Sequence, residues 1–308
     1  MIKKQFRSFY SQHMIHDIEK LIEYFSVFGG LGWEIDIDAP LDELIQTLIL
    51  DNFVFLHNQI LELTTDEVQY TKLLVNLARG DRRIFSAFNK SGMSNLYGGQ
   101  SLKHLQNTGV LEAEYSREVP PLKDGQKLKR EVARHRISHK MRFTSPFLRF
   151  WFYFIAPMRY YIEDGNFQKV IENFHKHHQA FVGYTFEELS NEMMKEKLSY
   201  LKLIDSGSYW DRHVEIDLMA TTIDDRLIVG ECKWKNHKMN KKELNKLLDK
   251  CERVGFEPDI LILFSKRGFS KEFLALQDKK IQLYGCEDFE DLLLDVSQAD
   301  LIQGFDKP

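Results

Sequence analysis

Two short stretches constrain the fold of this chain most, because each reads as a β-strand and the first of them alternates apolar and acidic residues. Residues 214–220 read VEIDLMA and residues 227–234 read LIVGECKW, with a turn-rich segment, 221–225, between them. This pattern predicts a β-hairpin. Side chains two positions apart share a face of a strand, so Glu231 and Lys233 point the same way. The neighbouring strand can bring Asp217 beside them.

Two carboxylates beside a lysine on a mostly apolar hairpin are costly unless another charge compensates them. A divalent cation is the natural compensation, since Mg²⁺ (or Mn²⁺) binds a few carboxylate oxygens and keeps several waters. We therefore predict that Asp217 and Glu231 hold the metal, with the backbone carbonyl of Cys232 as a further ligand. Lys233 would orient or activate an attacking water and offset phosphate charge. The alternative is a surface hairpin with an ordinary Glu–Lys pair of little energetic weight.

The elements expected after the hairpin complete an α/β arrangement. A basic helix is expected over 241–253, an apolar strand over 259–265, a helix through Phe273 and Leu276, and a last strand over 281–284. With the hairpin, these strands predict an α/β domain with a central mixed sheet.

This arrangement resembles the PD-(D/E)xK nuclease superfamily, in which an acidic residue on one strand and an E-x-K on the next form a metal site. The resemblance implies that Asp217, Glu231 and Lys233 hydrolyse a phosphodiester. In that superfamily a helix before the first strand often supplies another acidic ligand. Residues 181–189 are expected to begin such a helix, and Glu187 is the residue that matches this role.

The resemblance extends to one branch, the C-terminal half of archaeal-type AAA ATPases. That half is a winged helix followed by the nuclease-like domain of unknown function 234. The segments that carry the likeness are RFTSPFLRFWF, GSYW, EID and VGECKW, at residues 142–152, 207–210, 215–217 and 229–234. The likeness covers roughly residue 66 to the C-terminus. The chain departs from those ATPases because it contains no G-x-x-x-x-G-K-[ST], so we predict no ATP hydrolysis and no ATP cofactor.

Residues 66–145 are expected to form a winged helix-turn-helix. Helices over 68–78, 82–88 and 94–108 precede strands over 110–115 and 136–143, which is the order of that motif. The wing between the strands is basic, and a basic helix lies near residue 241, so we expect phosphate contacts from Lys127, Lys129, Arg130, Arg134, Lys103, Lys238, Lys241 and Lys242. The alternatives are a solvated loop and a solvated helix face, or a winged helix that docks protein instead of DNA.

The remaining segments are expected to be mostly helical. Residues 1–65 predict helices over 13–28 and 41–50 and then a hairpin over 52–63, which is the outline of a first winged helix. Residues 146–180 predict an aromatic helical connector, followed by the nuclease-like domain, 181–308. His175 and His178 lie on one face of a polar helix at a spacing that could bind metal, but a solvated face is favoured because a closed metal site needs more ligands. The predicted fold class is thus α+β and multi-domain.

Composition narrows the setting. The 308 residues include 42 Lys and Arg against 46 Asp and Glu, a net charge of −4, so only local charge can indicate nucleic acid. Three cysteines without C-x-x-C spacing and no signal-like N-terminus favour a reducing cytoplasm. The most apolar stretch, 147–157, is about eleven residues long, short of the roughly 20 that cross a bilayer, so no membrane partner is expected.

Three functions follow from these patterns. The first is a Mg²⁺-dependent, nuclease-like protein that binds and processes DNA. The second is a non-catalytic DNA-binding or regulatory protein that keeps the E-x-K domain as a fold. The third is a protein-interaction subunit of an ATPase or defence system, for which residues before 66 could dock a separate ATPase.

Overall fold

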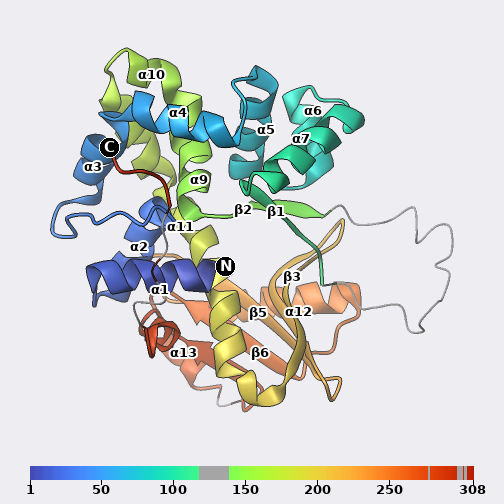
Figure 1. The fold of residues 1–308 in the computed structure, drawn as a ribbon. Coiled ribbons are helices and arrows are strands. Elements are labelled where there is room, and N and C mark those ends of the chain that lie inside the picture. The colour runs from blue at the N-terminus through green and yellow to red at the C-terminus, as the bar shows by residue number, and fades with distance from the viewer. Residues whose placement is uncertain (118–138, 277, 297–300, 302–303) are drawn as a thin grey trace. The chain divides into compact units, whose positions relative to one another are not determined.

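The chain divides into two structural units in the computed structural model, which describes residues 1–117, 139–276, 278–296, 301 and 304–308. Within these residues, the first unit comprises Met1–Glu114, Lys140–Thr185 and Leu292–Pro308, and the second comprises Tyr115–His139 and Phe186–Asp291. The predicted fold class is confirmed, since an N-terminal helical region is followed by an α/β part with a five-stranded mixed sheet (Figure 1).

The first unit is mainly helical. Its described helices are α1 (Ile2–His13), α2 (Ile18–Phe28), α3 (Leu41–Leu44) with a π-helical continuation over Ile45–Leu50, α4 (Phe53–Leu63), α5 (Val68–Arg79), α6 (Ile84–Ser91), α7 (Asn95–Asn107), α9 (Pro146–Phe150) with π and 3-10 turns over Trp151–Ile155 and Ala156–Met158, α10 (Arg159–Glu163) and the start of α11 (Phe167–Lys197). A two-stranded antiparallel sheet joins β1 (Leu111–Glu114) to β2 (Lys140–Phe143). None of the described helices is both long and apolar enough to span a membrane.

The element order predicted for residues 66–145 is present. Helices α5, α6 and α7 are followed by strands β1 and β2, which pair in the register Leu111↔Phe143. The Ser94 hydroxyl caps α7 by accepting a hydrogen bond from the Tyr97 N–H, as the sequence order Ser–Asn–Leu–Tyr favours. The basic residues predicted for the wing, Lys127, Lys129, Arg130 and Arg134, lie outside the described residues.

The hairpin predicted over residues 52–63 is wrong, because these residues form one helix, α4. Phe53, Leu56 and Ile60 are buried at helical spacing, whereas Val54 and Phe55 are exposed. The alternation of aromatic and branched residues resembled a strand, but tertiary burial of one helical face decided the outcome. Residues 1–65 therefore contain helices and no strand, and the outline of a first winged helix is not present there.

Two predicted helix boundaries also differ. The helix expected over 13–28 begins at Ile18, because α1 ends at His13 and Met14 has a positive φ of 51° that breaks the helical path. Helix α11 runs without a break from Phe167 to Lys197, so the boundary predicted between 180 and 181 falls inside a helix. Phe154, which precedes this helix in the chain, packs on it. Its ring lies 5.2 Å from the Phe174 ring and 5.1 Å from the Phe181 ring.

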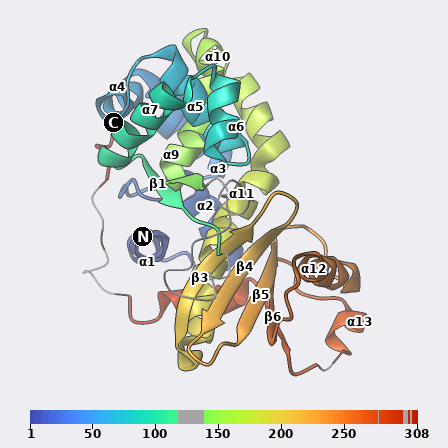
Figure 2. The ribbon, with the colours of Figure 1, turned by 90° about the vertical axis from the view of Figure 1, so that its right-hand side faces the viewer.

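The second unit contains the mixed sheet. Its described elements are the C-terminal part of α11, a 3-10 turn (Ser199–Leu201), β3 (Leu203–Trp210), β4 (Glu215–Thr222), β5 (Leu227–Lys233), α12 (Lys241–Val254), β6 (Ile260–Ser265), α13 (Lys271–Leu274), β7 (Ile281–Tyr284) and a 3-10 turn that begins at Glu287. The strand order is β3-β4-β5-β6-β7, antiparallel from β3 to β5 and parallel from β5 to β7 (Figure 2). The predicted hairpin, the basic helix and the last two strands are confirmed, and β3 is an addition.

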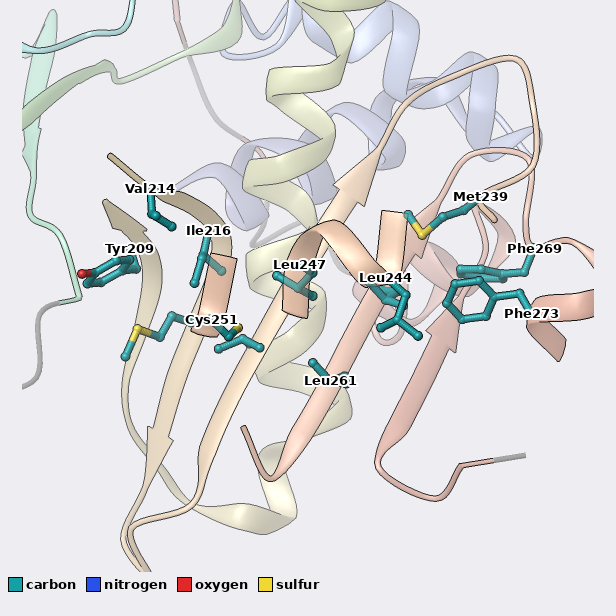
Figure 3. Close-up of a cluster of buried hydrophobic side chains, with 13 residues drawn as sticks. Tyr209, Val214, Ile216, Met239, Leu244, Leu247, Cys251, Leu261, Phe269 and Phe273 are labelled. Atoms are coloured by element: carbon teal, nitrogen blue, oxygen red, sulfur yellow. The ribbon is translucent and has the colours of Figure 1, made fainter. Parts of the chain in front are cut away.

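Helix α12 covers one face of this sheet. The Asn240 side chain caps its first turn and Gly255, with a φ of 71°, ends it. Leu244, Leu247 and Cys251 of α12 point toward strand residues such as Ile216 and Leu261 (Figure 3). This apolar packing fixes α12 over the strands that carry Asp217, Glu231 and Lys233.

Gly230, in the middle of β5, is a position where the sheet leaves no room for a side chain. A Cβ there would lie 2.5 Å from the Ile262 carbonyl oxygen of β6 and 3.1 Å from Leu218. We expect Gly230→Ala to lower the free energy of unfolding by about 1–3 kcal/mol, because backbone must move to admit the methyl group. Urea denaturation measures the change.

The matched control for that variant is Gly99→Ala, in helix α7, where a Cβ would meet no atom within 4 Å. The added methyl group there should stabilise the helix by about 0.4–1 kcal/mol. Equal effects of the two substitutions would contradict the close approach of β5 and β6 at Gly230.

Candidate active site

The strands β4 and β5 separate at the point where the predicted catalytic residues lie. Their pairing ends at Leu218↔Gly230, although β4 extends back to Glu215 beside β3 and β5 extends to Lys233 beside β6. The Asp217 side chain bridges the opening, since its Oδ2 accepts a hydrogen bond from the Cys232 N–H at 2.9 Å. A side-chain hydrogen bond thus takes the place of main-chain pairing between β4 and β5. The two strands separate at the position where a ligand would bind.

Glu231 lies at the centre of the charged cluster and is nearly buried, with 8% of its side chain exposed. Its Oε1 accepts a hydrogen bond from the Lys233 ammonium at 2.5 Å, as the alternation along β5 predicted. Its Oε2 accepts one from the Lys250 ammonium of α12 at 2.7 Å. Lys233 also lies 3.9 Å from Asp217 Oδ2. The structure therefore brings together Asp217, Glu231 and Lys233, and it adds Lys250.

The pKa values of two groups show how strongly the charges interact. Burial, and then the nearby charge of Glu231, raise the pKa of Asp217 to about 6. Burial alone would lower the pKa of Lys233, but the carboxylates of Asp217 and Glu231 raise it above its usual value. Lys233 is therefore a firmly held cation, and Asp217 carries a charge that is not fully compensated.

Cys232 and Glu187 lie differently from the other predicted residues. The Cys232 side chain is buried, and burial, followed by the charge of Asp217, raises the pKa of its thiol. Glu187 is on helix α11. In the part of the chain that the structure describes, no three His, Cys, Asp or Glu side chains gather as a metal-binding group. Glu187 and the Cys232 carbonyl thus remain predicted ligands only.

The predicted metal ligands Asp217 and Glu231 are carboxylates, the donor type that Mg²⁺ prefers. Among the described residues, the hydrogen bond and the ion pair of the Asp217 carboxylate are both made by Oδ2. Mg²⁺ sites in nucleotide-processing enzymes often use one or two carboxylates, with waters and substrate phosphates completing the coordination. The raised pKa of Asp217 is consistent with a place for a further cation.

The predicted phosphate-binding residues that the structure describes are all exposed. Lys103 lies on α7 in the first unit, and Lys238, Lys241 and Lys242 lie before and in the first turn of α12 in the second unit. In the first unit, the His175 ring lies 2.7 Å from a carboxylate oxygen of Asp42. No metal-binding group forms around this histidine among the described residues.

Lys250 is a site residue that sequence reasoning missed, because the basic helix was expected to contact phosphates and not a carboxylate of the sheet. The sequence signal that could have identified Lys250 is the spacing of the apolar residues in α12. Leu244, Leu247 and Cys251 mark the buried face, and Lys250 borders that face. Its neighbours on the helix therefore direct it to the sheet, unlike Lys246, whose side chain is 64% exposed.

Residues 151–247 match a family model described as archaea bacterial proteins of unknown function, the domain of unknown function 234. The match confirms the predicted domain over these residues, which include Asp217, Glu231 and Lys233 and end before Lys250. An uncharacterized protein of Methanocaldococcus jannaschii is 25% identical over 88% of this chain. The aligned part spans 60% of that relative's length.

A solved structure, protein VC1899 from Vibrio cholerae, is also similar to this chain, with 15% identity over 83% of this chain and 55% of that one. Its TM-score of 0.29 means that the two folds superpose poorly.

Proposed function

We propose that this chain is a metal-dependent, nuclease-like protein that binds DNA and hydrolyses phosphodiesters. The observation that carries the proposal is the convergence of Asp217, Glu231 and Lys233 at the opening between β4 and β5. The match to the domain of unknown function 234 names no activity, so the proposal depends on the chemistry of these three side chains and on the resemblance to PD-(D/E)xK nucleases.

The roles follow from charge and position. Asp217 and Glu231 would hold Mg²⁺ or Mn²⁺, which when bound supplies positive charge at the phosphate and a water of lowered pKa. Lys233 would donate hydrogen bonds to that water or to a phosphate oxygen. Since the pKa of Lys233 is raised, it acts as a cation and not as the base that removes a proton. Lys238, Lys241, Lys242 and, in the first unit, Lys103 would bind backbone phosphates.

A second candidate is a non-catalytic DNA-binding or accessory protein that works with a separate ATPase. It is favoured by one observation: among the described residues, no three His, Cys, Asp or Glu side chains form a metal-binding group. In that case the cluster would stabilise the domain and DNA would bind without being cleaved.

The experiment that separates these candidates is cleavage of supercoiled plasmid and of single-stranded DNA with Mg²⁺ or Mn²⁺. We expect nicking that EDTA abolishes and that Lys233→Ala lowers about 100-fold or more, because the cation at the reacting phosphate is lost. Lys246→Ala is the matched control, since Lys246 is an exposed lysine of α12 that contacts Glu243. It should cleave like the wild type.

Two outcomes would contradict the nuclease proposal. If folded wild-type protein and Lys233→Ala are equally inactive with either metal while DNA binding is retained, the accessory role is favoured. If both nick DNA equally, the activity has another site. Circular dichroism confirms that each variant is folded.

A further inference from the structure

Lys250 gives the site a second ammonium group that the E-x-K pattern does not include. It comes from α12, whereas Lys233 comes from β5, and the two ammonium groups contact different oxygens of the Glu231 carboxylate. Both oxygens of this nearly buried carboxylate therefore have a cationic partner. With Asp217, the cluster holds two negative and two positive charges.

The position of Lys250 is fixed by the packing of its helix. Leu247 and Cys251, on either side of it in the helical face, are buried against the sheet (Figure 3). Asn240 and Gly255 set the start and the end of α12. The Lys250 side chain is 28% exposed, and its ammonium is directed at Glu231 by a helix that cannot rotate without exposing those apolar residues.

A divalent cation that uses Glu231 must compete with these ammonium groups. Lys233 is one of the proposed catalytic residues, so its ammonium would stay beside the substrate phosphate. Lys250 occupies the other oxygen, and like charges that approach a bound metal within a few ångströms weaken its binding in a partly dry site.

We propose that Lys250 is a positioning residue that competes with the metal for Glu231 and so sets a low metal affinity for the free protein. This inference rests on the proposed metal site at Asp217 and Glu231. Because Glu231 has two ammonium partners, its carboxylate is compensated when no metal is bound. Glu231 would bind a metal ion only where the bonds of the metal to Glu231, Asp217 and a substrate phosphate outweigh the contact between Lys250 and Glu231.

The test is the affinity of the full chain for Mn²⁺ without DNA, measured by isothermal titration calorimetry and by the loss of the free-ion electron paramagnetic resonance signal. We expect Lys250→Met to bind Mn²⁺ about tenfold more tightly than the wild type, because a positive charge that competes with the metal at Glu231 is removed. Lys250→Gln should show a similar gain, whereas Lys250→Arg, which keeps the charge, should show none. Lys246→Met removes the same charge from an exposed position and is the matched control.

An unchanged or weaker Mn²⁺ affinity in Lys250→Met would overturn the inference, and so would an equal gain in Lys246→Met, since that would be a general effect of surface charge. Absence of Mn²⁺ binding in all proteins would overturn it together with the metal site. If no protein cleaves DNA and the gain is still seen, the inference stands and the nuclease proposal fails. If the protein cleaves DNA but Lys250→Met leaves the Mn²⁺ affinity unchanged, the nuclease proposal stands and the inference about Lys250 fails.

Discussion

Asp217→Asn should make the metal-free protein more stable and at the same time abolish cleavage. The carboxylate of Asp217 is mostly buried and lies beside the charge of Glu231, and together these raise its pKa to about 6. Asparagine removes the charge, while its carbonyl oxygen can still accept the hydrogen bond from the Cys232 N–H. We expect a gain of about 1–3 kcal/mol in the free energy of unfolding above pH 7, measured in EDTA. Cleavage should fall about 100-fold or more, because a metal ligand is lost.

The dependence on pH has a definite sign. The pKa of Asp217 is higher in the folded chain than its ordinary value of 3.8, so the folded state binds a proton more tightly than the unfolded state. The contribution of Asp217 to stability is therefore greatest below pH 4 and falls as pH rises from about 4 to about 6. The difference between wild type and Asp217→Asn should open over this interval and stay constant above it. A difference that is flat from pH 4 to 8 would contradict this.

In the second unit, the elements that the sequence predicted correctly are those whose residue pattern is typical of one kind of secondary structure. Alternation along β4 predicted a strand with two different faces, and the two-residue spacing of Glu231 and Lys233 on β5 placed them together. The apolar strand β6 and the basic helix α12 were equally clear. Strand β3 was missed because Leu203–Trp210 contains Asp, Gly and two Ser, which weaken a strand pattern. Hydrogen bonds from Ser116 and Arg117 to Trp210 and Ser208 cover its edge.

The errors in the first unit have a different origin. Residues 53–63 combine strand-favouring side chains with helical spacing, and the choice depends on which face is buried by residues far along the chain. The Phe53 ring stacks on Trp151, at a ring distance of 5.5 Å, and no local pattern reveals such a contact. Similarly, α11 continues through Phe181 because that ring packs on Phe150 and Phe154.

The site itself was only partly predictable. Lys250 is 17 positions from Lys233 and reaches Glu231 only because α12 folds back over the sheet. The role of Glu187 came from a family resemblance, and a helix was expected there, although α11 begins at Phe167 and not near residue 181. The described residues include no metal-binding group of three His, Cys, Asp or Glu side chains. Sequence identifies residues that share a strand more securely than residues that meet through tertiary packing.

Glu231→Ala should affect stability in the opposite direction to Asp217→Asn, although both remove one negative charge from the same site. Glu231 is the shared partner of the Lys233 and Lys250 ammonium groups, which are 22% and 28% exposed. Its loss leaves two positive charges without their shared carboxylate in a partly dry place. We expect the free energy of unfolding to fall by about 3 kcal/mol, the lower end for a broken buried ion pair, since the lysines can reach water.

Urea denaturation in EDTA measures this effect, and Glu243→Ala provides the matched control. Glu243 also contacts a lysine of α12, but that lysine, Lys246, is well exposed, so the loss should be at most about 1 kcal/mol. Adding Lys250→Met to Glu231→Ala should restore part of the stability, because one of the two stranded charges is removed. If Glu231→Ala and Asp217→Asn both stabilised the protein, the lysines would not be holding Glu231, and the carboxylates would be equivalent. Opposite signs would instead show that Glu231 anchors the cluster while Asp217 retains charge available to a metal.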